Sequence, residues 1–248
     1  MTNPPEIRHL DVRGRRIAYR LRRGRGPTLL FLPGYASDME GAKARALDAF
    51  AERRGQAMLR LDYSGTGSSG GRFEEGTLAL WLEEALAALD QLVEGPVVLI
   101  GSSMGGWIAL HLALLRPERV QAVVGLAAAP DFSDWGFAVE AKGRLRRGET
   151  LRRQSPYGGE QVTTAGFWSS GQDLRLLDRP IAINCPVRLL HGESDEDVPV
   201  DIALRTMRAL RSADVQLNLI KGGGHRLSEP HEIDAILRTV AALLEPAP

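Results

Sequence analysis

The chain has a single cysteine, Cys185, among its 248 residues, and that scarcity excludes two kinds of protein. One thiol cannot form an internal disulfide, and it cannot supply the several sulfur ligands of a cysteine-rich zinc site. No apolar run approaches the roughly 20 residues that span a bilayer. The N-terminus also lacks an apolar stretch of the signal-peptide kind. We therefore expect a protein without a membrane span in a reducing compartment, and we predict a cytoplasmic location.

A net charge is also lacking, because 31 Lys and Arg residues balance 31 Asp and Glu residues. A neutral chain has no overall field that attracts nucleic acid, so nucleic acid is not an expected partner. Hydrophobic residues make up 44% of the chain and charged residues 25%, which is ordinary for a globular protein and unlike a disordered one. A chain of this length can fold as one α/β domain.

Short apolar runs bounded by Gly, Pro or Asp predict six strands, at residues 28–32, 57–61, 97–100, 120–126, 187–190 and 215–220. Runs such as 97–100 are apolar on both faces, which indicates strands buried inside a mostly parallel sheet. The run at 215–220 alternates apolar and polar residues, which is typical of a half-exposed edge strand. Residues 7–21 predict a further hairpin at the edge of the sheet.

Apolar residues at spacings of three and four predict helices between these strands, over 78–92 after the N-cap Thr77, over 108–115 and over 233–243. Strands that alternate with helices are joined by right-handed crossovers, which place helices on both faces of the sheet. The sequence therefore predicts an α/β fold with a mostly parallel central sheet.

Residues 130–180 interrupt this alternation, since no strand and helix unit is clear there. A long insertion in a compact domain is usually a lid or a disordered segment, and its aromatic residues favour one that packs. We predict an α/β core of residues 1–129 and 181–248 with a cap insertion at 130–180. The expected pocket residues are Tyr35, Phe132, Trp135, Phe167 and Trp168. Six basic residues between Lys142 and Arg153 suit either an anionic part of a substrate or an ordinary solvated face.

Ser103 is the candidate nucleophile, because it is the central residue of a Gly-x-Ser-x-Gly pattern at 101–105. A strand is predicted before the pattern and a helix after it, so the serine lies on a tight turn that points its hydroxyl above the sheet. The glycines leave room for neighbouring backbone. A Gly/Ser turn that merely joins strand to helix is the alternative interpretation, and the flanking elements favour the catalytic one.

A serine hydroxyl needs a base to take its proton, and His225 is the best placed of the five histidines. It follows three glycines, between the last predicted strand and the last predicted helix. The acid that orients this base is expected in the acidic stretch after the strand at 187–190. Asp195 is the preferred candidate, Asp197 is its nearest rival, and Asp131 is a less favoured alternative.

Two backbone amides are expected to form an oxyanion hole. The Met104 amide lies at a helix start, where N–H groups face developing negative charge. The second donor is expected from the loop after the first long strand, and there Gly34 permits a turn and Tyr35 supplies the amide. The Tyr35 side chain either lines the pocket or packs as an ordinary aromatic residue.

A second glycine motif, Gly65-x-Gly67-x-x-Gly70, matches the pattern of dinucleotide-binding loops. A dinucleotide-binding loop opens directly into a helix, whereas here residues 71–76 intervene before the next predicted helix. The acidic residue expected about 20 positions further on would fall inside that helix instead of at the end of a second strand. Nucleotide binding is therefore disfavoured.

These motifs together resemble the α/β-hydrolase superfamily along nearly the whole chain, and their order Ser103, Asp195, His225 is the order of that fold. A closer similarity, carried by residues 31–35, 62–69, 101–107, 184–192 and 225–226, is to the subfamily of the animal mitochondrial acyl-glucuronide esterase and palmitoyl-protein thioesterase, which has bacterial relatives.

The resemblance implies a serine hydrolase that cleaves a small-molecule acyl ester or thioester through an acyl-enzyme. Its triad would be Ser103, Asp195 and His225, without a metal or an organic cofactor. The similarity departs at residues 130–180 and in the glycines before His225, so the choice of substrate stays open. Carbon–carbon bond hydrolysis on the same fold and a non-catalytic binding scaffold are the alternatives.

Overall fold

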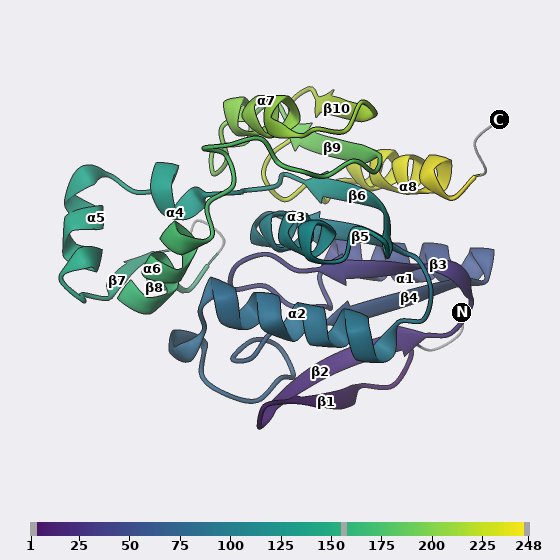
Figure 1. Ribbon diagram of the computed structural model, residues 1–248, viewed down its shortest axis with the longest axis horizontal. Helices are drawn as coiled ribbons and strands as arrows, with labels where there is room; N and C mark the ends of the chain where they lie inside the picture. Colours follow the sequence, from purple (N-terminus) through teal and green to yellow (C-terminus); the bar gives the residue numbers. More distant parts are fainter. Residues whose placement is uncertain (1–3, 155–157, 246–248) are drawn as a thin grey trace.

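The computed structural model describes residues 4–154 and 158–245. Within them, eight strands form one sheet in the order β1-β2-β4-β3-β5-β6-β9-β10 (Figure 1). The strands are β1 Arg8–Val12, β2 Arg15–Arg22, β3 Arg25–Leu32, β4 Gln56–Leu61, β5 Val97–Ser102, β6 Val120–Leu126, β9 Val187–Gly192 and β10 Val215–Ile220. Strand β2 pairs antiparallel with both β1 and β4. From β4 to β10 in this order, all neighbours pair parallel. The six predicted strands and the predicted edge hairpin are confirmed.

The central strands are buried on both faces, as their continuous apolar runs predict. In β3, Leu30 and Leu32 join one core cluster while Leu29 and Phe31 join the other, because successive side chains of a strand alternate between faces. Each such side chain, when fully buried, contributes roughly 1.5–3 kcal/mol to stability. The two clusters lie on opposite sides of the sheet and anchor the strand ends that carry the site.

Five helices of the described chain cover these two faces. The first face is covered by α2 (Leu78–Leu92), α3 (Met104–Leu115) and α7 (Val200–Ala209), and the second by α1 (Ala42–Arg54) and α8 (Pro230–Leu244). Helix α2 has the predicted bounds, and the Thr77 Oγ accepts a hydrogen bond from the Leu80 amide at 3.1 Å. Helices α3 and α8 begin earlier than predicted, and α1 and α7 are additional. The apolar period of α1 is weak because its buried face includes Ala44, Ala51 and the acid Asp48.

The 130–180 segment connects β6 to β9 and carries its own small elements. They are α4 (Phe132–Trp135), α5 (Val139–Arg146), β7 (Leu151–Gln154), β8 (Glu160–Thr163) and α6 (Ala165–Asp173). Figure 1 shows them gathered at one end of the molecule, away from α8. Their side chains pack together, since Leu145 and Phe167 are each 1% exposed. This packing explains why the segment is rich in aromatic residues.

Candidate active site

Ser103 lies between β5 and α3 with backbone angles of φ 53° and ψ −118°. A residue with a β-carbon is strained by about 1–3 kcal/mol in such a conformation, and it persists only where the surroundings hold it. Here the Ser103 amide donates to the Leu126 carbonyl at 2.9 Å, and the Ser103 carbonyl accepts from the amides of Gly106 and Ala129 at 2.9 and 3.1 Å. The turn is therefore fixed by the neighbouring strand β6 and by the start of α3.

Both glycines of the motif are required by close backbone contacts. A β-carbon on Gly101 would lie 2.2 Å from the Gly105 carbonyl oxygen, and one on Gly105 would lie 2.1 Å from the Leu32 carbonyl oxygen. Real β-carbons do not approach so closely, so no side chain fits at either position. The Gly-x-Ser-x-Gly pattern thus reports tight packing of β3, β5 and α3 around the serine.

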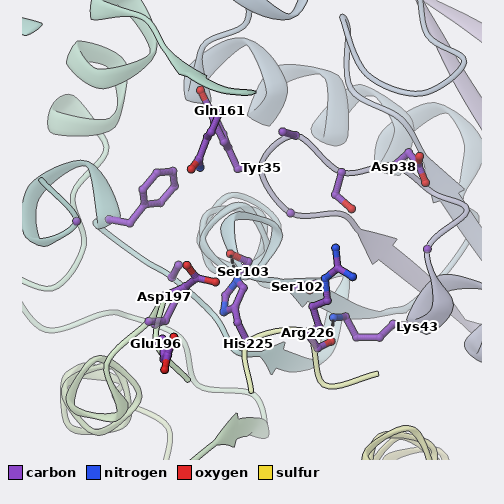
Figure 2. Close-up of a pocket in the computed structure, with 18 of the residues that line it drawn as sticks. Tyr35, Asp38, Lys43, Ser102, Ser103, Gln161, Glu196, Asp197, His225 and Arg226 are labelled. Carbon is purple, nitrogen blue, oxygen red and sulfur yellow. Dashed lines mark hydrogen bonds between the residues drawn. The ribbon is translucent and has the colours of Figure 1, made fainter. Parts of the chain in front are cut away.

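Ser103, His225 and Asp195 form one hydrogen-bonded series. The His225 Nε2 lies 3.1 Å from the Ser103 Oγ, and the His225 Nδ1 lies 2.9 Å from an Asp195 carboxylate oxygen. Because an ionised carboxylate only accepts hydrogen bonds, Nδ1 carries the proton and Nε2 is left to accept from the serine hydroxyl. Figure 2 shows the imidazole pointing at Ser103 from the loop after β10. This arrangement gives the serine a base and gives the base a fixed tautomer.

The Asp195 carboxylate is fully buried, and its second oxygen accepts from the backbone amides of Asp197 and Val198, both at 2.9 Å. Burial alone would raise the pKa of Asp195, but the hydrogen bonds from His225 and from these two amides outweigh it and hold the pKa below its ordinary value. Asp195 therefore stays ionised at neutral pH. The rival Asp197 is exposed and contributes its backbone amide to this site.

Asp131, the third acid considered, serves a different part of the chain. Its two carboxylate oxygens accept from the amides of Leu176 and Leu177 at 2.8 and 2.7 Å, and burial raises the pKa of this carboxyl. These bonds fasten the chain after α6 to the end of β6. The structure therefore gives Asp131 a role in holding the 130–180 segment and no contact with His225.

The loop after β3 lies against the serine. A β-carbon on Gly34 would be 3.3 Å from the Ser103 Cβ, so this loop packs directly against the serine before it continues into Tyr35. Helix α3 begins at Met104, and the amides of a first helical turn have no partner within the helix. The two predicted oxyanion donors thus lie in the loop that packs against Ser103 and at the residue directly after it. The Met104 side chain is fully buried in the core and takes no part in the pocket.

A cavity of about 810 Å³ opens beside Ser103 (Figure 2). Tyr35, Phe132 and Trp135 line it, as predicted. Phe167 and Trp168 are absent from its described lining, because the Phe167 ring packs 4.6 Å from the Tyr35 ring and the Trp168 indole donates to the Ser133 carbonyl at 2.8 Å. Those two aromatic residues hold the 130–180 segment together instead.

Tyr35 joins the β3 loop to the 130–180 segment. Its hydroxyl donates to the Val162 carbonyl at 2.6 Å, and its ring contacts four other aromatic rings, those of Phe73, Trp81, Phe132 and Phe167. Burial raises the pKa of the Tyr35 phenol well above its ordinary value, so the hydroxyl keeps its proton. Both interpretations of this side chain therefore hold, since it lines the cavity and packs among aromatic residues.

The six basic residues of the 130–180 segment are mostly engaged with other side chains. Carboxylate partners are present for four of them: Lys142 with Asp134, Arg144 and Arg147 with Glu149, and Arg152 with Glu160. Arg146 lies over the Trp168 ring, 5.6 Å from its centroid. Arg153 lines the cavity and donates to Gln161 at 2.8 Å. Most of this basic patch is therefore a solvated face, and Arg153 is its member that lines the cavity.

The glycine motif at 65–70 and a cluster of possible metal ligands are both occupied by contacts within this protein. A β-carbon on Gly67 would overlap the Asp62 carboxylate at 2.1 Å, and that carboxylate accepts from the amides of Met39 and Ser68 at 2.7 and 2.8 Å. The loop at 65–70 thus closes around a side chain of this protein instead of cradling a phosphate. Asp195, Asp197 and His225 place ligating atoms within 4.8 Å of one another, and two of these residues already bond to each other, His225 Nδ1 to an Asp195 oxygen at 2.9 Å.

The chain matches the model of a family described as alpha/beta hydrolase fold over residues 27–145. Human palmitoyl-protein thioesterase ABHD10, mitochondrial, is 38% identical over 234 residues, which are 92% of this chain and 76% of that protein. The mouse protein of the same name is 39% identical, over 92% of this chain and 79% of its own length. The chain belongs to the α/β-hydrolase family.

Solved structures agree with this assignment. Mouse alpha/beta hydrolase domain-containing protein 10 matches this α/β hydrolase with a TM-score of 0.91 and 37% identity, over 96% of this chain and 98% of that one. A putative hydrolase from Agrobacterium vitis S4 matches with a TM-score of 0.91 and 36% identity, over 98% and 100%. The predicted fold class is confirmed, and so is the prediction of a serine hydrolase that acts on esters or thioesters.

The predicted cytoplasmic location is wrong, because the curated relatives from human and mouse are named as mitochondrial proteins. Apolar stretches mark secretory signal peptides, whereas organelle transit peptides are amphipathic and Arg-rich, so the lack of an apolar stretch does not bear on a mitochondrial location. In residues 4–154 and 158–245, no helix has the length and apolar character to cross a bilayer.

Lys43 was missed by the sequence reasoning. It projects from the first turn of α1 into the lining of the cavity, and its ammonium donates to the Arg226 carbonyl, directly after His225. The two residues are 183 positions apart, so no local pattern signals the contact. Phe137 and Gln161 also line the cavity without having been singled out.

Proposed function

We propose that Ser103, His225 and Asp195 are the catalytic triad of this α/β hydrolase and that it hydrolyses long-chain acyl thioesters or esters. The observation that carries the proposal is the series of hydrogen bonds from the Ser103 Oγ through His225 to Asp195, at 3.1 and 2.9 Å. A buried, ionised acid that fixes the base tautomer is what a serine nucleophile needs at neutral pH.

The reaction begins when His225 Nε2 takes the proton of Ser103 and the Oγ attacks the carbonyl carbon. The amides of Tyr35 and Met104 bind the oxyanion of the tetrahedral intermediate, while Asp195 stabilises the imidazolium. The intermediate collapses, and the thiol or alcohol leaves with the proton from His225. Water, deprotonated by His225, then attacks the acyl-enzyme, so the products are a carboxylic acid and a thiol or alcohol.

The lining of the cavity supports a long or bulky acyl group. Phe132, Trp135 and Phe137 present aromatic surface to a space of about 810 Å³, and such surface favours apolar ligands. The similarity to relatives named palmitoyl-protein thioesterase supports a thioester of a long-chain acid. An acyl ester of an anionic sugar, of the acyl-glucuronide type, is the second candidate, because the cation Arg153 lines the same cavity beside Gln161.

We also propose that residues 1–129 and 181–248 form the hydrolase core and that the 130–180 segment is a cap. The segment connects β6 to β9, which are neighbours in the sheet, and it supplies Trp135, Phe137 and Arg153 to the cavity. Both observations support this division. Differences within such a cap would then set the choice of substrate, while the core supplies the chemistry.

The test is a panel of acyl thioesters and esters of increasing chain length, assayed with the wild-type protein and with Ser103→Ala. We expect turnover that rises with chain length, and a loss of several orders of magnitude in the variant without a change in folding. Unchanged hydrolysis by Ser103→Ala contradicts the triad. A preference for acetyl over long chains contradicts the proposed substrate while leaving the triad intact.

A further inference from the structure

We propose that Lys43 is a positioning residue that holds the His225 loop in place for catalysis, an inference that rests on the proposed function. Lys43 Nζ donates a hydrogen bond to the Arg226 carbonyl, one residue after the base. Figure 2 shows Lys43 beside Arg226 at the edge of the cavity, on the opposite side of His225 from Asp197. Lys43 itself never needs to touch the substrate for this role.

The His225 loop depends on contacts from outside, because its sequence gives it little rigidity. Three glycines precede the histidine, and glycine leaves the backbone more freedom than any other residue. Before the histidine, Gly222 donates to Glu193 at 3.1 Å and Gly223 accepts from the Ser194 amide at 2.9 Å. Both contacts come from the loop after β9, which also carries Asp195. They fix the loop to the acid.

Lys43 provides the matching contact after the histidine and from the other side of the cavity. It belongs to α1, which follows the β3 loop that carries the Tyr35 amide. The hydrogen bond from Lys43 therefore joins α1, which follows the loop with an expected oxyanion donor, to the loop that carries the base. Catalytic geometry tolerates errors of about 0.5 Å, and a displacement of 1 Å costs about 100-fold in rate. The hydrogen bond from Lys43 to the Arg226 carbonyl therefore determines whether His225 and the oxyanion donors are aligned with the same substrate carbonyl.

The charged groups that face Lys43 come from three elements. Glu232 on α8 and Asp195 after β9 favour its positive charge, whereas Arg226 on the His225 loop opposes it. Burial is the largest effect, and it lowers the pKa of the Lys43 ammonium to about 8. The ammonium therefore loses its proton within the working range of most assays. An uncharged amine makes a weaker hydrogen bond to a carbonyl than an ammonium does.

The sign of the pH effect follows from this pKa. Below pH 8 Lys43 is charged and its hydrogen bond to the Arg226 carbonyl is strong, and above pH 8 this hydrogen bond weakens. We expect kcat of the wild-type protein to fall through about pH 8 to a lower plateau. Lys43→Arg keeps a charged donor to far higher pH, because a guanidinium does not deprotonate in proteins, so its activity should persist above pH 9.

The decisive variant is Lys43→Met, which keeps the aliphatic stem and removes the donor. A hydrogen bond from a charged group is worth about 10- to 100-fold in an equilibrium, and we expect a loss of that size in kcat with little change in KM. The kcat of this variant should also show no fall near pH 8. Because its lowered pKa means that the folded protein disfavours the charged form of Lys43, the variant's melting temperature at pH 7 should be equal to or above that of the wild-type protein.

Lys221→Met is the matched control, since Lys221 is exposed and lies at the opposite end of the three glycines. It should keep wild-type kcat and the step near pH 8. The rate at which a fluorophosphonate labels Ser103 gives a second reading of the Ser103–His225 pair that does not depend on the substrate, and it should fall in Lys43→Met alone.

Three results would overturn the inference: a Lys43→Met protein with wild-type kcat, one that keeps the step near pH 8, or one that loses activity only in proportion to a lowered melting temperature. Failure of the proposed function looks different. In that case Ser103→Ala would hydrolyse acyl thioesters as fast as the wild-type protein, and the wild-type protein would take no label at Ser103.

Discussion

Replacing Asp195 by asparagine tests the most specific element of the site, the choice of acid. Asparagine has the same shape, and its oxygen can still accept from the amides of Asp197 and Val198, which lie 2.9 Å from the native carboxylate. Its NH2 group, however, would face the His225 Nδ1 at the 2.9 Å contact. Two donors cannot face each other, so the imidazole would carry its proton on Nε2 and could no longer accept from Ser103.

The size of the effect follows from the tautomer. Replacement of the triad acid by its amide lowers kcat by about 10⁴-fold in a serine protease, which corresponds to about 5.4 kcal/mol of transition-state stabilisation. We expect a loss of that order for Asp195→Asn, with a melting temperature near that of the wild-type protein. Asp197→Asn is the matched control, because Asp197 is exposed and its backbone amide, which is retained, makes the contact with Asp195. Loss of an exposed charge should change kcat by less than about fivefold.

The assay measures kcat and KM for one long-chain thioester at pH 7, together with thermal melting of each variant. If Asp197→Asn loses as much activity as Asp195→Asn, or more, the assignment of the acid is wrong. If Asp195→Asn keeps more than about a tenth of wild-type kcat, the tautomer argument itself fails.

Three further predictions concern the scaffold around the serine. Ser103→Gly should melt about 3 °C above Ser103→Ala. Glycine relieves about 1–3 kcal/mol of backbone strain at this position and costs about 0.5–1 kcal/mol of entropy. Equal melting temperatures would contradict strain at φ 53°. Gly105→Ala should misfold or melt several degrees lower because of the 2.1 Å overlap with Leu32, whereas Gly224→Ala, with nothing within 4 Å, should fold normally. Tyr35→Phe strands the Val162 carbonyl and should cost about 1–2 kcal/mol, visible as a lower melting temperature; an unchanged value would mean that water replaces the hydroxyl.

The alternation of apolar strands and helices was readable from the sequence because it is a local property. Val97–Ile100 is apolar on both faces and precedes a glycine turn, a pattern that predicts a buried strand. The Gly-x-Ser-x-Gly pattern was readable for a related reason, since steric exclusion of side chains at Gly101 and Gly105 is written directly in the residue type. Helix α1 escaped because alanines bury without producing a strong apolar period.

The pocket was readable only in part. Trp168 and Phe167 looked like lining residues by composition, but whether an aromatic ring faces a cavity or a core depends on the path of α6, which composition does not specify. The basic residues from Lys142 to Arg153 suited either an anion site or a solvated face, and the sequence did not decide between the two. Their acidic partners, among them Asp134 and Glu149, become visible only once the chain is folded.

By itself the sequence determined the fold class and the serine at the turn, because each depends on residues that are neighbours along the chain. Only the tertiary structure decided which acid meets His225, which rings line the cavity, and that Lys43 reaches the carbonyl of Arg226. Those contacts join residues 30 to 183 positions apart, and the distance between them is set by the packing of the whole sheet. Local sequence thus specifies the turn that carries the serine, and the fold specifies how the other groups of the site are aligned with it.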